Sequence, residues 1–167
     1  RTTNELASLL HHDDMRVRLR AQFAIAERGN ASAEVFSQIA TRDDNHLARL
    51  HAIWGLGQIG RTAPTSKNLA PVIALLKDED SEVRAQSARV LGDAHFKPAA
   101  AAIVNLLADE SPRVRFFAAL SLGALRSEDA GNLVISMLRE NDGKDRYLTH
   151  AGVVALEKIG DREFVQQ

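Results

Sequence analysis

One short pattern recurs along this chain of 167 residues and constrains its fold more than any other feature. Each copy is an apolar residue followed by Arg or Thr, then a run of small and apolar residues that ends near a glycine. The residues that follow the opening apolar position are Arg18, Arg49, Arg84, Arg115 and Thr149, at intervals of 31, 35, 31 and 34 residues. A nearly constant period of this length is the signature of a repeat architecture, in which each unit packs only against its neighbours.

Each repeat is expected to consist of two helices joined by a polar turn. The recurring pattern lies on the second helix, and residues that can cap a helix precede it, as Ser111 does with Pro112 at the first helical position. Shorter segments with apolar residues at helical spacing supply the first helices, at residues 4–10, 33–41, 68–77, 98–108 and 130–140. No stretch alternates in the manner of a β-strand. The sequence therefore predicts an all-α fold, a right-handed α-α superhelix (solenoid) of about five helix pairs.

The length of the chain favours a single domain. We expect residues 1–167 to form one repeat domain, with units at about residues 1–30, 31–61, 62–95, 96–127 and 128–161. Because the sequence begins with Arg1 and stops soon after the fifth copy of the pattern, we interpret it as a piece of a longer polypeptide.

The composition argues against several classes of function. Lys and Arg total 21 while Asp and Glu total 22, so the net charge is -1, whereas nucleic-acid binders usually carry a strongly basic face. The absence of Cys excludes disulfides, thiolate metal sites and covalent haem attachment within these residues. No apolar run approaches the roughly 20 residues that cross a bilayer as a helix. We therefore expect no nucleic-acid partner and no membrane insertion by this segment.

The repeated motif resembles that of a known family. It reads Asp-x-x-Val-Arg-x-x-Ala-Ala-x-Ala-Leu-Gly-x-x-Gly, and the copies with Arg84 after Asp80 and Arg115 after Glu110 match it well. This pattern is similar to the short HEAT-like repeat first named from bilin lyases, whereas the signatures of tetratricopeptide and ankyrin repeats are absent. The resemblance covers almost the whole chain and implies a helical solenoid, but it says little about function because one fold can serve many functions.

Two segments carry a narrower resemblance. Residues 15–24 and 46–57 are similar to HEAT-like segments inside large extracytoplasmic proteins of planctomycetes and their relatives, which also carry a dehydrogenase-like propeller and a haem-binding cytochrome c domain. This resemblance implies a periplasmic or extracytoplasmic location, for which the residues themselves give no evidence. Since the chain has no Cys-x-x-Cys-His motif, the haem of such a protein would lie outside it.

The repeated arginines Arg18, Arg49, Arg84 and Arg115 have two interpretations. They could form a track for anions such as phosphates, or a structural ladder in which each guanidinium reaches acidic residues or carbonyls at the neighbouring turn. Repetition at one position of every unit favours the structural ladder. Thr149 breaks the series, so the last interface is expected to be the weakest.

The face of the second helices opposite the predicted core is apolar where solvent-facing residues should be polar. In a solenoid this face lines the concave surface, where partners bind. The residues predicted to contact a partner are Leu19, Arg20, Phe23, Leu50, His51, Trp54, Arg89, Phe116, Phe117 and Leu120. Trp54 is the expected anchor, because it is the only Trp and is costly to leave in water. The alternative is that these side chains simply pack on one another.

No set of residues suggests catalysis, cofactor binding or metal binding. The segment 11–14, His-His-Asp-Asp, contains metal-ligand types, but adjacent residues seldom converge on one ion and a solvated turn is favoured. The apolar face holds no carboxylate, and only His51 and His150 could act there as an acid or base. We therefore expect no catalytic, cofactor-binding or metal-binding residue in this segment.

These observations predict a segment that is not an enzyme. It is expected to be a scaffold that binds another protein or neighbouring domains of the same polypeptide. The narrower resemblance implies that such a polypeptide would be an extracytoplasmic dehydrogenase or cytochrome c protein. The alternative is a HEAT-like enzyme related to bilin lyases or to alkylpurine DNA glycosylases, although a glycosylase would need more positive charge for phosphates. A designed repeat protein is a third interpretation, which the irregular spacing and the divergent fifth unit disfavour.

Overall fold

The structure is a computed structural model that describes residues 1–63 and 65–160. Pro64 and residues 161–167, which include the end of the fifth predicted unit, lie outside the described residues. Within the described residues the secondary structure consists of helices and their connecting turns, without a strand. The predicted all-α class is therefore confirmed. None of the helices in these ranges is long and apolar enough to span a membrane.

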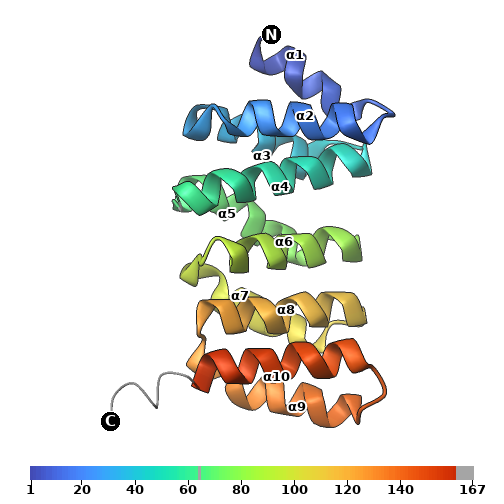
Figure 1. Ribbon diagram of the computed structural model, residues 1–167, viewed down its shortest axis with the longest axis vertical. Helices are drawn as coiled ribbons and strands as arrows, with labels where there is room; N and C mark the ends of the chain where they lie inside the picture. The colour runs from blue at the N-terminus through green and yellow to red at the C-terminus, as the bar shows by residue number, and fades with distance from the viewer. Residues whose placement is uncertain (64, 161–167) are drawn as a thin grey trace. The chain divides into compact units, whose positions relative to one another are not determined.

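The chain divides into two compact units, Arg1–Leu75 and Leu76–Gln167. The prediction of one domain with five units at the stated boundaries stays a prediction. The first unit holds α1 (Thr3–Ser8), α2 (Met15–Ala26), α3 (Ala33–Arg42), α4 (His46–Thr62) and α5 (Ser66–Ala74). Within it, α2 and α4 pack side by side, and α3 packs against α4 from the other layer (Figure 1).

The second unit repeats this arrangement. Its helices are α6 (Ser81–Asp93), α7 (Ala100–Val104), α8 (Pro112–Leu125), α9 (Gly131–Asn141) and α10 (Arg146–Gly160). The helices α6, α8 and α10 form one layer in which α8 contacts both of the others, and α7 and α9 lie in the layer behind it (Figure 1). The predicted helix at 98–108 differs from the observed structure, because α7 is a short α-helix flanked by 3₁₀ turns at Lys97–Ala99 and Asn105–Ala108.

Acidic and amide side chains begin most of the second helices. Asp14, Asn45 and Asp80 each accept a hydrogen bond from a backbone N–H of the first turn that follows, which satisfies a donor that has no partner inside the helix. At α8 the expected N-cap residue, Ser111, is in place, but the expected capping hydrogen bond to its side chain is not formed. Its own N–H donates to Asp109 Oδ1 at 2.9 Å.

Small residues let the second helices of the second unit approach each other closely. A Cβ at Gly92 of α6 would lie 2.7 Å from the backbone Cα of Ser121 in α8. The Ser121 hydroxyl donates to the carbonyl of Ala88 at 2.8 Å. On the other side of α8, a Cβ at Gly123 would lie 2.8 Å from the Cα of Ala155 in α10. The glycine and serine positions of the motif are therefore packing positions between consecutive repeats.

Candidate partner-binding surface

The repeated arginines all reach backbone carbonyls near the inter-helix turns. Carbonyls at helix ends have no partner inside the helix, so a guanidinium that reaches them satisfies an otherwise unpaired acceptor. The bonds run from Arg18 Nη1 to His12 O (2.7 Å) and Asp13 O (2.8 Å), from Arg49 Nε to Ala40 O (3.0 Å), from Arg84 Nη1 to Asp78 O (2.8 Å) and Glu79 O (2.9 Å), and from Arg115 Nη1 to Asp109 O (2.6 Å) and Glu110 O (3.2 Å).

Arg84 has a further, acidic partner. Its guanidinium binds both carboxylate oxygens of Asp109, which lies in the next turn of the second unit. These hydrogen bonds raise the pKa of Arg84. Burial works against ionisation of Asp109, but the bonds from Arg84 and from the N–H of Ser111 hold its pKa below the usual value. Arg18 and Arg84 are only 7% and 8% exposed, so an anion in solvent has little access to either.

In the first unit, the predicted contact residues divide between the surface and the interior. Leu19 and Phe23 of α2 are 39% and 47% exposed, and Arg20 between them is exposed as well. Trp54 of α4 is partly exposed. These four residues lie where a partner could touch them.

Leu50 and His51 are not surface residues, which corrects their predicted placement. They are 6% and 3% exposed, because α4 packs against α2 along this side. His51 Nδ1 lies 2.7 Å from Gln22 Oε1, and Gln22 also donates to Gln58 at 3.2 Å. Burial, together with the nearby positive charge of Arg18, lowers the pKa of His51 to about 4. His51 is therefore neutral at pH 7, and its ring also contacts Trp54 edge to face.

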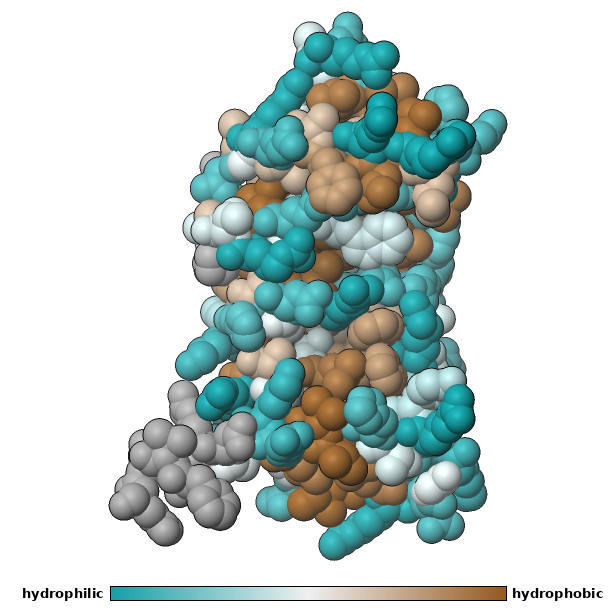
Figure 2. Space-filling view, in the orientation of Figure 1, coloured by the Kyte–Doolittle hydropathy of each residue, from teal (hydrophilic) through white to brown (hydrophobic). Residues whose placement is uncertain are grey.

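In the second unit, aromatic rings and arginines gather on the face of α6, α8 and α10 that lies opposite the core. The guanidinium carbons of Arg89 and Arg113 lie 5.7 and 5.1 Å from the ring centre of Phe117. Phe116 contacts Phe117 edge to face at 5.1 Å between ring centres. Phe116, Phe117 and the predicted contact residue Leu120 are partly exposed, and Arg89 is exposed. Figure 2 shows hydrophobic side chains exposed over α8–α10 among polar ones.

Three residues of this surface were not among those predicted. Arg113, Arg146 and Tyr147 lie in the first turns of α8 and α10, and our assignment of the outer face began one turn later. Tyr147 is 61% exposed, and Arg146 lies 4.8 Å from its ring centre and donates to its hydroxyl. The signal was present in the sequence, because Tyr147 holds the same place before Thr149 that Arg113 holds before Arg115.

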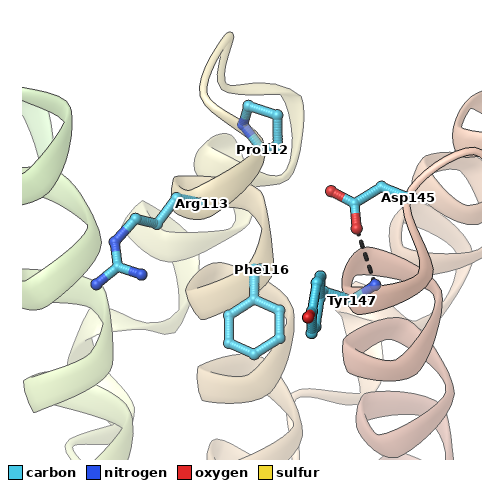
Figure 3. A pocket seen from close by; sticks show the side chains of 5 residues that line it. All are labelled: Pro112, Arg113, Phe116, Asp145 and Tyr147. Carbon is cyan, nitrogen blue, oxygen red and sulfur yellow. Dashed lines mark hydrogen bonds between the residues drawn. The ribbon is translucent and has the colours of Figure 1, made fainter.

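A pocket opens on this surface between α8 and α10. Its volume is about 400 Å³, and Pro112, Arg113, Phe116, Asp145 and Tyr147 line it. Figure 3 shows Phe116 and Tyr147 extending from the two helices into the same space, with Asp145 at its edge. In residues 1–63 and 65–160, no three histidine, aspartate or glutamate side chains are placed to share a metal ion. We call the set Arg89, Arg113, Phe116, Phe117, Arg146 and Tyr147 the aromatic–arginine surface.

Comparison with known proteins identifies the repeat. A family profile described as HEAT repeats matches residues 69–157. No curated protein matches the chain. Among solved structures, phycocyanin lyase from Nostoc sp. PCC7120, a complex of CpcE and CpcF, is similar at a TM-score of 0.72 and 20% identity, over 95% of this chain and 65% of that one. The chain thus spans slightly less than two thirds of that relative.

Two further structures share the fold at lower similarity. Human deoxyhypusine hydroxylase, in complex with glycerol, matches at a TM-score of 0.63 and 17% identity over 95% of this chain and 62% of that one. A designed armadillo repeat protein in complex with the peptide (KR)4 matches at a TM-score of 0.63 and 17% identity over 92% and 80% of the two chains. These likenesses confirm the HEAT-like repeat and the helical solenoid class.

The same comparisons correct one prediction. We expected this segment not to be an enzyme, because its outer face holds few groups that could act as acid or base. Phycocyanin lyase and deoxyhypusine hydroxylase are enzymes whose structures share this fold over 95% of the chain. That prediction was therefore wrong: the fold occurs in enzymes as well as in binding proteins, and a solenoid surface with few acid or base groups does not separate the two classes.

Proposed function

This chain belongs to the HEAT repeat family, and on that basis we propose that it is an interaction module that binds a protein through its aromatic–arginine surface. HEAT-like solenoids offer extended surfaces suited to protein partners. The designed armadillo repeat protein of the same fold was solved with a peptide bound, which supports a peptide or an extended protein segment as the occupant.

The observation that carries this proposal is the arrangement of rings and guanidinium groups on α6, α8 and α10. Aromatic residues and arginine are the side chains most enriched at the centres of protein interfaces. Here Arg89 and Arg113 are held against the ring of Phe117, and Arg146 against that of Tyr147. Side chains held in place before binding lose less conformational entropy when a partner arrives.

The occupant is proposed to be a neighbouring domain of the same polypeptide or a separate protein. The resemblance to HEAT-like segments of extracytoplasmic dehydrogenase and cytochrome c proteins supports a neighbouring domain of that kind. A net charge of -1 supports a protein partner over a nucleic acid. Proteins that bind nucleic acids neutralise many phosphates and therefore need an excess of Lys and Arg.

A peptide library displayed on phage and selected on the purified chain tests this proposal. Selected peptides are expected to lose roughly tenfold or more in affinity when Tyr147, which is exposed, is replaced by Ala, since interface aromatics commonly contribute that much. Leu133→Ala is the matched control, because Leu133 is 45% exposed but lies on α9 in the other layer. Peptides that bind the wild type and both variants equally would contradict the proposal.

A chromophore lyase is a second candidate, favoured by the similarity in fold to phycocyanin lyase over 95% of the chain. Titration of the chain with phycocyanobilin distinguishes the two functions. A shifted absorption band that saturates at one equivalent of phycocyanobilin would favour the lyase function. An unchanged spectrum would favour the interaction function.

A further inference from the structure

The pocket between α8 and α10 combines an aromatic lining with one acidic group. Phe116 from α8 and Tyr147 from α10 extend into it, and Pro112 adds an apolar side (Figure 3). The faces of aromatic rings carry partial negative charge, so two rings in one pocket favour a cation as well as an apolar group.

Asp145 leaves one carboxylate oxygen available at this pocket. Its Oδ1 accepts from the N–H groups of Tyr147 (2.8 Å) and Leu148 (3.1 Å), so this oxygen caps α10. Its Oδ2 accepts no hydrogen bond from any residue that the structure describes. Figure 3 shows the second oxygen turned away from the capping bond. The backbone of Asp145 is held in place by Asn141, which bonds to both its N–H and its carbonyl.

The arginine beside the pocket does not use this carboxylate. Arg113 extends toward α6, away from Asp145 and Tyr147 (Figure 3). Its guanidinium binds Glu82 at 2.9 Å and lies over the ring of Phe117. Its charge is therefore balanced by Glu82, and what it offers the pocket is the side of its aliphatic stem. Arg146 contacts the ring of Tyr147 and makes no ion pair with Asp145 among the described residues. The acidic oxygen thus faces the pocket without a cationic partner.

We propose that this pocket seats one lysine or arginine side chain of the partner, with Phe116 and Tyr147 against its stem and Asp145 Oδ2 paired with its charge. This assignment rests on the proposed interaction function and names the chemistry that the partner must present there. The aromatic faces and the free carboxylate oxygen both favour a cation, and the apolar sides accommodate the methylenes of a long basic side chain.

Three features near the same site favour an anion instead. The positive end of α8 begins at Pro112 beside the pocket. Arg146 carries a positive charge nearby, and Arg115 and Lys144 line a neighbouring pocket that Asp145 also borders. Of these, the helix end is the weakest, because its effect at a solvent-exposed site is small and is screened by salt. Because features that favour a cation and features that favour an anion compete here, the experiment must measure which sign of charge the pocket prefers.

Three acetylated and amidated tripeptides, Gly-Lys-Gly, Gly-norleucine-Gly and Gly-Glu-Gly, serve as probes in NMR titrations of the 167-residue chain. We expect the lysine peptide to shift the signals of Phe116 and Tyr147 and to bind roughly fivefold or more tightly than the norleucine peptide, as an added charge-assisted bond predicts. The glutamate peptide is expected to bind most weakly. Equal binding of the lysine and norleucine peptides, preference for glutamate, or no shift at the pocket would overturn the cation site.

Two pairs of variants test which groups carry the effect. Asp145→Asn keeps the capping oxygen, since Asn caps helices about as well as Asp, and is expected to remove most of the preference for lysine without lowering the melting temperature. Asp44→Asn is its matched control, because it changes the net charge equally at an exposed residue of the other unit. Tyr147→Phe keeps the ring and should bind like the wild type, whereas Tyr147→Leu should bind more weakly.

The two proposals fail in different ways. If the phage-selected peptides depend on Tyr147 but bind Asp145→Asn as well as they bind the wild type, the interaction function stands and the cation site is wrong. If the lysine tripeptide binds as expected while no selected peptide depends on the aromatic–arginine surface, the interaction function is wrong and the charge preference of the pocket stands.

Discussion

Arg84 and Asp109 form a two-fold hydrogen-bonded ion pair between consecutive repeats of the second unit, with Nε 2.8 Å from Oδ2 and Nη2 2.9 Å from Oδ1. The side chains of both are largely buried, at 10% and 8% exposure. The same guanidinium also bonds to the carbonyls of Asp78 and Glu79 in its own turn. One side chain therefore joins the turn that precedes α6 to the turn that precedes α8.

Replacing Arg84 by Ala should destabilise the chain strongly. The variant leaves the Asp109 carboxylate buried without its cation, and breaking one side of a buried pair typically costs about 3–5 kcal/mol. Arg115→Ala is the control, because Arg115 is more exposed and bonds only to carbonyls, for which about 1–2 kcal/mol is expected. Urea unfolding followed by circular dichroism measures both. A loss for Arg84→Ala no larger than that for Arg115→Ala would show that the ion pair adds nothing.

Gly92→Ala should destabilise the contact between α6 and α8. The new Cβ would lie 2.7 Å from the backbone of Ser121, which cannot move aside as the end of a flexible side chain can. Overpacking of this kind costs roughly 1–3 kcal/mol. Gly131→Ala in α9 is the matched control, because a Cβ there meets no atom within 4 Å and Ala has the higher helix propensity. The melting temperature should fall for Gly92→Ala and stay level or rise for Gly131→Ala. The opposite order would contradict the close approach of α6 to α8 at Gly92.

Acidification should weaken the first unit through His51. Its pKa is lowered to about 4 in the folded chain from an ordinary value of 6.5, so the unfolded state binds more protons between these values. Stability is then complete above about pH 6.5 and is lost progressively as the pH falls toward 4. At pH 5 the loss amounts to about 2 kcal/mol. Urea unfolding at pH 7.5 and pH 5 measures it.

His51→Gln separates this effect from that of the carboxylates. Gln cannot take up a proton, so the variant should lose clearly less stability than the wild type over the same interval of pH. Trp54 reports the event directly, because its ring contacts His51 edge to face at 5.0 Å between ring centres. Its fluorescence should change with a midpoint near pH 4 in the wild type only. An identical pH dependence of stability in both proteins would assign the loss to other groups.

Much of the local structure could be predicted from the sequence. The recurring motif placed all five second helices, and the polar residues before them included the N-caps Asp14, Asn45 and Asp80. The carbonyls bonded by Arg18, Arg84 and Arg115 precede each arginine by five and six residues. Interactions of this range repeat with the motif, because each unit builds the same turn. They are encoded by short stretches of chain.

The surface could be predicted only in part. Arg20, His51 and Phe117 hold the same place relative to the repeated arginine, yet Arg20 is exposed, His51 is 3% exposed and Phe117 is partly exposed. Helical periodicity gives the direction of a side chain around its own axis. It does not give the distance to the next helix, which depends on the size of the residues on both facing helices.

The sequence by itself therefore determined the helices, their period, their caps and the turn-directed arginines, since these follow from residues close together along the chain. Tertiary structure alone decided that His51 is buried against Gln22, that Arg84 meets Asp109, and that Phe116, Tyr147 and Asp145 surround one pocket. Each of these joins residues 25 or more positions apart or lies between two separate helices. Such contacts depend on how closely neighbouring repeats pack, and that closeness is set by the combined volumes of side chains from both repeats.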